Sequence, residues 1–305
     1  MSIPTRSFTA LSIAAGWCNA GTIVLKRAWV EQFKDRATID ASFTVDHAHK
    51  NPNPGAKDGD IHVAGRAPNE IGLPMVAEVM NAKNDQPAVQ LIHADEGDGS
   101  FIAVTGAWRL WFEHPPASGA QIQFADVPPA ANTNPDHCFE IHPLTNVGGN
   151  DLTASFHDIP GFTPKDADAA FSSYEKLTVT VRANDTAVTL DSPKSGFNYV
   201  LFAIRPLGGA TSLDDGGLAF LCDVAADIGE AAVARNVRMI FVPGTEPFKA
   251  VQNGFSDDLK VLGIPRVNLN AVSTFINAPE NADSVTAAAG VTRKLPYEMI
   301  IVALE

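Results

Sequence analysis

The sequence is short of cysteine, of basic residues and of long apolar runs, and each shortage excludes a class of protein. It holds three cysteines in 305 residues, Cys18, Cys138 and Cys222, which lie far apart and form no CxxC pair. A zinc ribbon or a dense disulfide framework needs closely spaced cysteines. Buried free thiols are therefore expected, and they favour a reducing, cytoplasmic compartment.

Basic residues are outnumbered by acidic ones. The 22 Lys and Arg against 35 Asp and Glu give a formal net charge of -13, and no run of Lys or Arg stands out. An acidic surface repels the phosphate backbone of nucleic acids. We therefore expect that nucleic acid is not the partner.

No apolar run reaches the roughly 18 residues that a membrane-spanning helix needs, so a soluble protein is expected. Residues 8–16 loosely resemble a signal peptide, but the stretch is short and is interrupted by Thr, Ser and Gly. The sequence also lacks a Gly-x-Ser-x-Gly elbow, a Walker loop and a His-Glu-x-x-His motif. No complete catalytic constellation can be read from it.

Short β-branched runs separated by Gly, Pro, Asn and Asp fill most of the chain and predict a mostly β protein. Helical periodicity is confined to short segments, such as residues 28–33 and 228–234. After an N-terminal segment with a short helix (1–36), five strands are expected in an OB-like β-barrel over residues 37–150. They are residues 37–46, 60–66, 75–81, 101–112 and 138–147.

The second half of the chain repeats this plan in its apolar pattern and in its Gly positions. A second β domain over residues 172–305 is therefore expected, and it reads as a degenerate OB-like copy in tandem with the first. Residues 176–191 read as a hairpin that turns at Asn184 and Asp185. The five strands of the copy are expected at residues 199–207, 215–221, 237–243, 259–266 and 297–304.

Two strand motifs carry the best local indication of chemistry: DGDIH at residues 58–62 and FEIHP at residues 139–143. Successive side chains on a strand face opposite sides, so Asp58, Asp60, His62, Glu140 and His142 share the face away from the barrel core. Imidazole and carboxylate groups are good ligands for zinc or manganese. The alternative is structural: the aspartates shape a turn and the histidines bond to nearby carboxylates.

His47 and His49 form a His-x-His pair at the end of the first strand, and this is a known spacing of metal ligands. They fall in phase with Phe43 and Val45, which should be buried. A β-bulge at the strand end would bring one of them beside His62. The alternative is a solvated loop with two ordinary histidines.

The fourth strand is aromatic. Trp108 and Phe112 share one parity and should face the barrel interior. Trp111 and Arg109 would then face outward, with Arg66 nearby. Exposed aromatic residues on an OB-like barrel stack on sugars or bases, so these three residues are candidates for ligand contact.

The DGDIH and EIHP runs, together with Ala77-Glu78-Val79, resemble a loosely defined group of bacterial OB-like β-barrel proteins. Members carry a D-x-D-x-H strand and a closing E-x-H-P strand. The resemblance covers residues 37–147. It implies the barrel fold, and it implies no particular activity.

Three functions are compatible with these observations. OB-like barrels most often bind extended polymers or partner proteins, so a non-catalytic binding or assembly protein is the first, with a protein or an oligosaccharide as its partner. The second is a metal-dependent hydrolase in which Asp60, His62, Glu140 and His142 hold the ion and one carboxylate acts as general base. The third is a self-associating structural protein, although the sequence does not indicate an oligomeric state.

Overall fold

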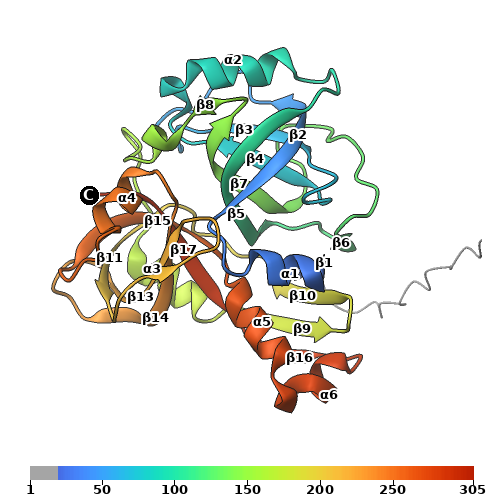
Figure 1. Cartoon of the computed structure of the whole chain (residues 1–305), viewed down its shortest axis with the longest axis vertical. Helices are drawn as coiled ribbons and strands as arrows, with labels where there is room; N and C mark the ends of the chain where they lie inside the picture. Colours follow the sequence, from blue (N-terminus) through green and yellow to red (C-terminus); the bar gives the residue numbers. More distant parts are fainter. Residues whose placement is uncertain (1–19) are drawn as a thin grey trace, which may run out of the picture.

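The computed structural model describes residues 20–305, which form three β-sheets, and two of these close into barrels (Figure 1). The protein is mostly β, as predicted. The signal-like residues 8–16 and Cys18 lie outside the described residues. Among residues 20–305, no helix is long and apolar enough to cross a membrane.

The first barrel contains the five predicted strands in the spatial order first, second, third, fifth, fourth. The fourth strand pairs with the first, and the third lies parallel to the fifth, so the sheet closes on itself. This confirms the OB-like barrel. The strands are β2 (Thr38–Ala48), β3 (Ile61–Arg66), β4 (Met75–Val79), β5 (Ile102–His114) and β7 (His137–Val147), and β7 pairs with the short β8 (Asn150–Asp151).

The second barrel repeats the same strand order, with its third and fifth strands again parallel. The second barrel expected from the apolar pattern is therefore present. Its strands are β11 (Val200–Pro206), β13 (Leu218–Ala225), β14 (Ala232–Phe241), β15 (Leu259–Val267) and β17 (Tyr297–Leu304), with the short β12 (Thr211–Ser212) beside β13.

The helix expected at residues 228–234 is wrong, because β14 already begins at Ala232. A turn precedes the strand. Asp227 accepts a hydrogen bond from the backbone N–H of Ile228, and Gly229 has a φ of 81°. Glycine adopts this left-handed conformation readily, and it ends any helix there.

The third sheet joins segments from distant parts of the chain, in the order β16 (Val291–Lys294), β9 (Thr178–Ala183), β10 (Ala187–Pro193), β1 (Ala20–Lys26) and β6 (Ala120–Ile122). The predicted hairpin is its centre. The Asn184 side chain accepts hydrogen bonds from the N–H groups of Thr186 and Ala187, which fixes the turn. The hairpin pairs with strands of its own and does not belong to either barrel.

Short helices cover the ends of the sheets. The predicted N-terminal helix is α1 (Arg27–Phe33), whose Glu31 accepts hydrogen bonds from two side chains of α5 (Leu269–Asn277). The helix α2 was not predicted, because residues 83–99 are mostly polar; it forms because Ala88, Val89 and Ile92 pack on the first barrel. The remaining helices are α3 (Ala167–Tyr174), α4 (Glu246–Val251), α5 (Leu269–Asn277) and α6 (Ala282–Thr286), and α2 itself spans Gln86–Ala94.

Candidate metal site between the barrels

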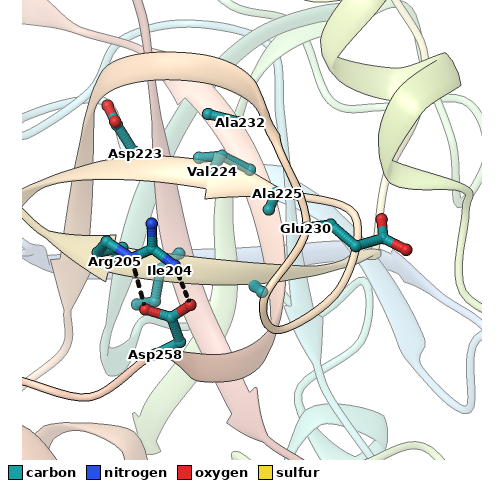
Figure 2. Close-up of a pocket in the computed structure, with 9 residues that line it drawn as sticks. Ile204, Arg205, Asp223, Val224, Ala225, Glu230, Ala232 and Asp258 are labelled. Atoms are coloured by element: carbon teal, nitrogen blue, oxygen red, sulfur yellow. Dashed lines mark hydrogen bonds and ion pairs between the residues drawn. The ribbon is translucent and has the colours of Figure 1, made fainter.

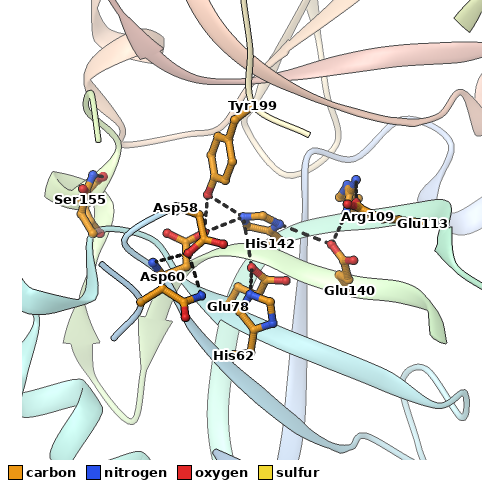
Figure 3. Close-up of polar contacts among 12 residues, drawn as sticks. Asp58, Asp60, His62, Glu78, Arg109, Glu113, Glu140, His142, Ser155 and Tyr199 are labelled. Carbon is orange, nitrogen blue, oxygen red and sulfur yellow. Dashed lines mark hydrogen bonds and ion pairs between the residues drawn. The ribbon is translucent and has the colours of Figure 1, made fainter. Parts of the chain in front are cut away.

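Three neighbouring strands of the first barrel place Asp60, Glu78 and His142 together. Asp60 directly precedes β3, Glu78 lies on β4 and His142 lies on β7. Their strand neighbours Ile61, Val79 and Ile141 belong to the barrel core, so the alternating side chains point out of the barrel. The outward face is nevertheless covered, because the start of β11 from the second barrel lies over it (Figure 3).

The ligand atoms of these three residues lie within 4.8 Å of one another. The Nε2 atom of His142 is 3.4 Å from an oxygen of Asp60 and 3.7 Å from an oxygen of Glu78. Asp60 and His142 are 0% exposed and Glu78 is 5% exposed. These spacings are close to those between the ligand atoms of one small metal ion.

Both ring nitrogens of His142 have partners. Its Nδ1 faces a Glu140 carboxylate oxygen at 3.3 Å, and its Nε2 faces the Tyr199 hydroxyl at 2.8 Å. The Tyr199 hydroxyl donates a hydrogen bond to Asp60 at 2.5 Å. Tyr199 immediately precedes β11, so the second barrel supplies a hydroxyl group to the cluster on the first.

Glu140 is neutralised by its own partners. Arg109 donates a hydrogen bond to one carboxylate oxygen, and His137 Nε2 lies 3.2 Å from the other. Burial alone would raise the pKa of Glu140, but Arg109 and the two neighbouring histidines hold it well below its usual value. Glu140 is thus a charged carboxylate that belongs to an ion pair.

Asp60 and Glu78 differ from Glu140, because no Lys or Arg among residues 20–305 forms an ion pair with either one. Burial raises the pKa of both carboxyl groups, that of Glu78 to about 8. Burial would lower the pKa of His142, yet the surrounding carboxylates raise it well above its usual value. One Asp60 oxygen, Oδ1, is buried and has no hydrogen-bond partner in the described chain. A protonated His142 is then the one cation close to two buried carboxyl groups in the described part of the chain, so the cluster can take up further positive charge.

His62 stands beside Glu78. The two residues are paired across β3 and β4, and the His62 Nε2 atom is 3.3 Å from a Glu78 oxygen. Burial lowers the pKa of His62 and favours its neutral form. Its Nδ1 atom is buried and makes no hydrogen bond within residues 20–305. His62 therefore has a free lone pair or N–H group next to the cluster.

The predicted bulge at the end of the first strand is present, as a register shift between Val45 and His47. It brings His49 onto His62, where the two rings stack with centroids 4.7 Å apart. His47 instead faces Glu96 at the surface, at 3.7 Å. Of the two histidines, only His49 reaches the neighbourhood of the cluster.

A cavity of about 270 Å³ adjoins the cluster and is lined from both barrels. Glu78, His62 and Tyr199 form part of its wall, while Lys57 and Lys165 also line it. Asp58 lines the cavity too, and it shapes the turn before β3 by accepting hydrogen bonds from Asn53 and from the Asp60 N–H. The volume is suited to a small molecule.

A second hollow lies on the second barrel, where Arg205 and Asp258 form a two-bonded ion pair (Figure 2). Its volume is about 20 Å³. This space holds about one water molecule, so it is not a ligand site.

The structure corrects the expected exposure of Trp111 and Arg109. Trp111 is 2% exposed and packs edge-on against Tyr174, while Arg109 is 0% exposed and lies between the barrels. The second barrel and α3 cover the face that the strand alternation left open. Arg66 pairs with Asp46 at 2.8 Å. A stacking surface of these three residues for a sugar or a base is therefore absent.

Sequence reasoning missed Glu78 and Tyr199. Glu78 is the one charged residue of β4, and in the barrel order β4 lies between the strands of Asp60 and His142. A lone carboxylate in an apolar strand was a usable signal. Tyr199 had none, because it reaches the cluster through the packing of one barrel on the other.

No protein-family model and no curated protein matches the sequence. The resemblance to bacterial OB-like barrel proteins is thus supported in its fold, as two five-stranded barrels, and identifies no family. The site has to be interpreted from its own geometry.

Proposed function

We propose that the protein binds a divalent transition-metal ion through Asp60, Glu78 and His142, and that it uses the ion to hydrolyse a substrate held in the adjoining cavity. The observation that carries this proposal is the pair of buried carboxylates that have only histidines, and no Lys or Arg of the described residues, as basic partners. Burying a carboxylate is costly unless a cation or a proton neutralises it. A divalent ion at this point would neutralise both.

The surroundings of His142 support the same proposal. Histidines that bind metals commonly donate their other ring N–H to a carboxylate, which fixes the ring and the tautomer. Glu140 stands in this position at Nδ1 and leaves Nε2 directed toward Asp60 and Glu78. Glu140, which the sequence suggested as a ligand, is therefore assigned to positioning, because Arg109 already neutralises it.

One nitrogen and two carboxylate ligands suit zinc or manganese. A bound ion of this kind lowers the pKa of a water ligand toward neutrality and so supplies a nucleophile. His62 lines the cavity, is favoured in its neutral form and has an unpartnered ring nitrogen, so it can accept the proton of that water. Its distance to Glu78 also allows it to serve as a further ligand.

Metal content tests the binding. The protein is purified without a metal-binding tag, and we expect about one ion per chain by mass spectrometry, lost in Asp60→Asn, Glu78→Gln and His142→Gln. The control is His93→Gln, a surface histidine 3.7 Å from Glu96, which should keep the ion. Equal metal content in all variants, with circular dichroism showing intact folds, would contradict the site.

Turnover tests the hydrolase. A panel of nitrophenyl esters and phosphoesters is assayed with zinc-loaded, manganese-loaded and chelator-treated protein. We expect turnover that the chelator abolishes and the metal restores. Metal binding without any turnover would contradict the hydrolysis and would favour the non-catalytic binding role, which, like self-association, stays a prediction.

A further inference from the structure

Two lysines at the cavity have no carboxylate partner. Lys57 and Lys165 are exposed and line the cavity, and neither forms an ion pair within residues 20–305. Elsewhere, Lys34, Lys260 and Lys294 pair with acidic groups, while other lysines, such as Lys249, form no ion pair within the described residues. What sets Lys57 and Lys165 apart is that both line one cavity. The Lys57 Nζ atom has the Asn53 side-chain oxygen as an acceptor, at 3.4 Å, and no carboxylate. Two ammonium groups without a carboxylate partner thus line one cavity of a chain of net charge -13, and they favour an anionic ligand there.

The backbone holds both lysines in place. The Lys165 N–H donates to the Tyr199 carbonyl at 2.9 Å, so Lys165 runs beside the segment that caps the metal site. The Lys57 N–H donates to the Pro54 carbonyl at 2.8 Å, which ties it into the turn before Asp58. The two lysines therefore lie on different, hydrogen-bonded segments that line the same cavity.

Apart from Glu78, which belongs to the metal cluster, the acidic groups of the cavity wall accept hydrogen bonds from other parts of the chain. Glu113 and Glu140 both accept hydrogen bonds from Arg109, and Asp58 accepts from the Asn53 side chain and a backbone N–H. They do not neutralise the lysines. A metal ion at the Asp60 cluster would add further positive charge to the same space.

Two further residues of the cavity wall indicate which other groups a ligand should carry. Phe162 contributes an apolar ring, packed edge-on against Tyr199 with centroids 5.5 Å apart. Asn198 contributes a side-chain oxygen that is buried and has no donor in the described part of the chain. A bound molecule with an N–H or O–H group would satisfy that oxygen.

We propose that the substrate is a small molecule with an anionic oxygen group, a carboxylate or a phosphate, which Lys57 and Lys165 bind at the cavity while Asn198 accepts a hydrogen bond from it. This inference rests on the proposed function, because the metal site defines where the scissile bond lies. The cavity volume of about 270 Å³ suits a small molecule.

Calorimetric titration of two inert anions, methylphosphonate and acetate, into metal-loaded full-length protein tests the proposal. We expect one of them to bind, and binding to weaken by about tenfold or more in Lys57→Ala and in Lys165→Ala, because each loses a charge-assisted hydrogen bond. Lys249→Ala, an exposed lysine on α4, should bind like wild type. Preference for methylphosphonate identifies a phosphate group, and preference for acetate a carboxylate.

Binding of neither anion, or equal binding by wild type and the Lys57→Ala/Lys165→Ala double variant, would overturn the proposal. Metal content measured on the same samples separates the two failures. Metal without lysine-dependent anion binding overturns the substrate assignment and leaves the metal site standing. Lysine-dependent anion binding without metal supports the anion site and overturns the proposed function.

Discussion

Arg109 and Arg266 occupy equivalent positions in the two barrels, and each donates a hydrogen bond to the backbone of the other barrel. Arg109 Nε donates to the Pro265 carbonyl and Arg266 Nη1 to the Trp108 carbonyl, each at 3.0 Å. Each acceptor directly precedes the opposite arginine. These two reciprocal hydrogen bonds join the barrels between β5 and β15.

The correspondence between the barrels includes the glutamates that pair with these arginines, but it does not include the metal site. Arg266 pairs with Glu298 at 2.6 Å, as Arg109 pairs with Glu140. In the parallel strand pairs, Val76 aligns with Glu140 and Arg238 aligns with Glu298. Two residues further along, the second barrel has Ile240 and Ile300 where the first has Glu78 and His142. The second barrel therefore keeps the arginine–glutamate pair that joins the barrels, but it lacks counterparts of the metal-ligand candidates Glu78 and His142.

The contacts that Arg109 and Arg266 make between the barrels should stabilise the fold. Arg266 is fully buried, donates to three carbonyl groups and lies 3.6 Å from the Trp108 ring centre. Arg266→Ala removes the donor of three buried carbonyl groups and leaves Arg238 as the one cation of the described residues at the buried Glu298, so we expect the free energy of unfolding to fall by about 3–5 kcal/mol. Arg205→Ala removes an exposed ion pair and should cost about 1 kcal/mol or less. Urea denaturation measures the free energy of unfolding of both variants. Similar losses in the two would contradict a stabilising role of Arg266 between the barrels.

The two equivalent glutamates give a matched test of positioning. Glu140→Gln weakens the hold on His142 Nδ1, so we expect zinc affinity to fall about 10–100-fold, the usual effect of removing such a partner. Glu298→Gln breaks the equivalent ion pair in the barrel without ligands and should leave zinc affinity unchanged. Competition with a chromophoric chelator measures both affinities. Equal losses in the two variants would indicate that general destabilisation, rather than ligand orientation, is responsible.

The barrels could be predicted from sequence because alternation of apolar and polar residues is local. The runs around Ile61 and Ile141 predicted the strands and placed Asp60 and His142 on the face opposite the core. Burial of that face could not be predicted, since it depends on how the second barrel packs. The expected exposure of Trp111 and Arg109 failed for the same reason. The ion pair between Glu140 and Arg109 could not be predicted either, because it depends on which side chains the fold brings together.

Chelator-treated protein should lose stability as the pH rises. The pKa values of Asp60 and Glu78 are raised in the fold, that of Glu78 from 4.5 to about 8, so the folded state binds these protons more tightly than the unfolded chain. Stability is then greatest below about pH 4.5 for these groups and declines between pH 4.5 and 8. The raised pKa of His142 acts in the same direction.

Glu78→Gln removes one of the titrating groups. We expect it to flatten the pH dependence and to stabilise the chelator-treated protein at pH 8 by at least about 1.4 kcal/mol, the equivalent of one pKa unit. Melting temperatures from pH 5 to 9 provide the measurement. If the stability of the metal-free wild-type protein is constant over this pH range, the raised pKa values of Asp60 and Glu78 are contradicted.

The hydroxyl of Tyr199 should matter most when the metal is absent. Tyr199→Phe leaves Asp60 without its 2.5 Å donor, and an unpartnered buried acceptor costs about 1–3 kcal/mol. A bound ion offers Asp60 another partner, so the loss should shrink in zinc-loaded protein. Tyr174→Phe is the control: its hydroxyl donates to the Phe197 carbonyl, and its loss should cost the same with or without zinc. Thermal unfolding of both variants in zinc and in chelator measures the difference, and a zinc-independent loss in Tyr199→Phe would mean that Asp60 does not bind the ion.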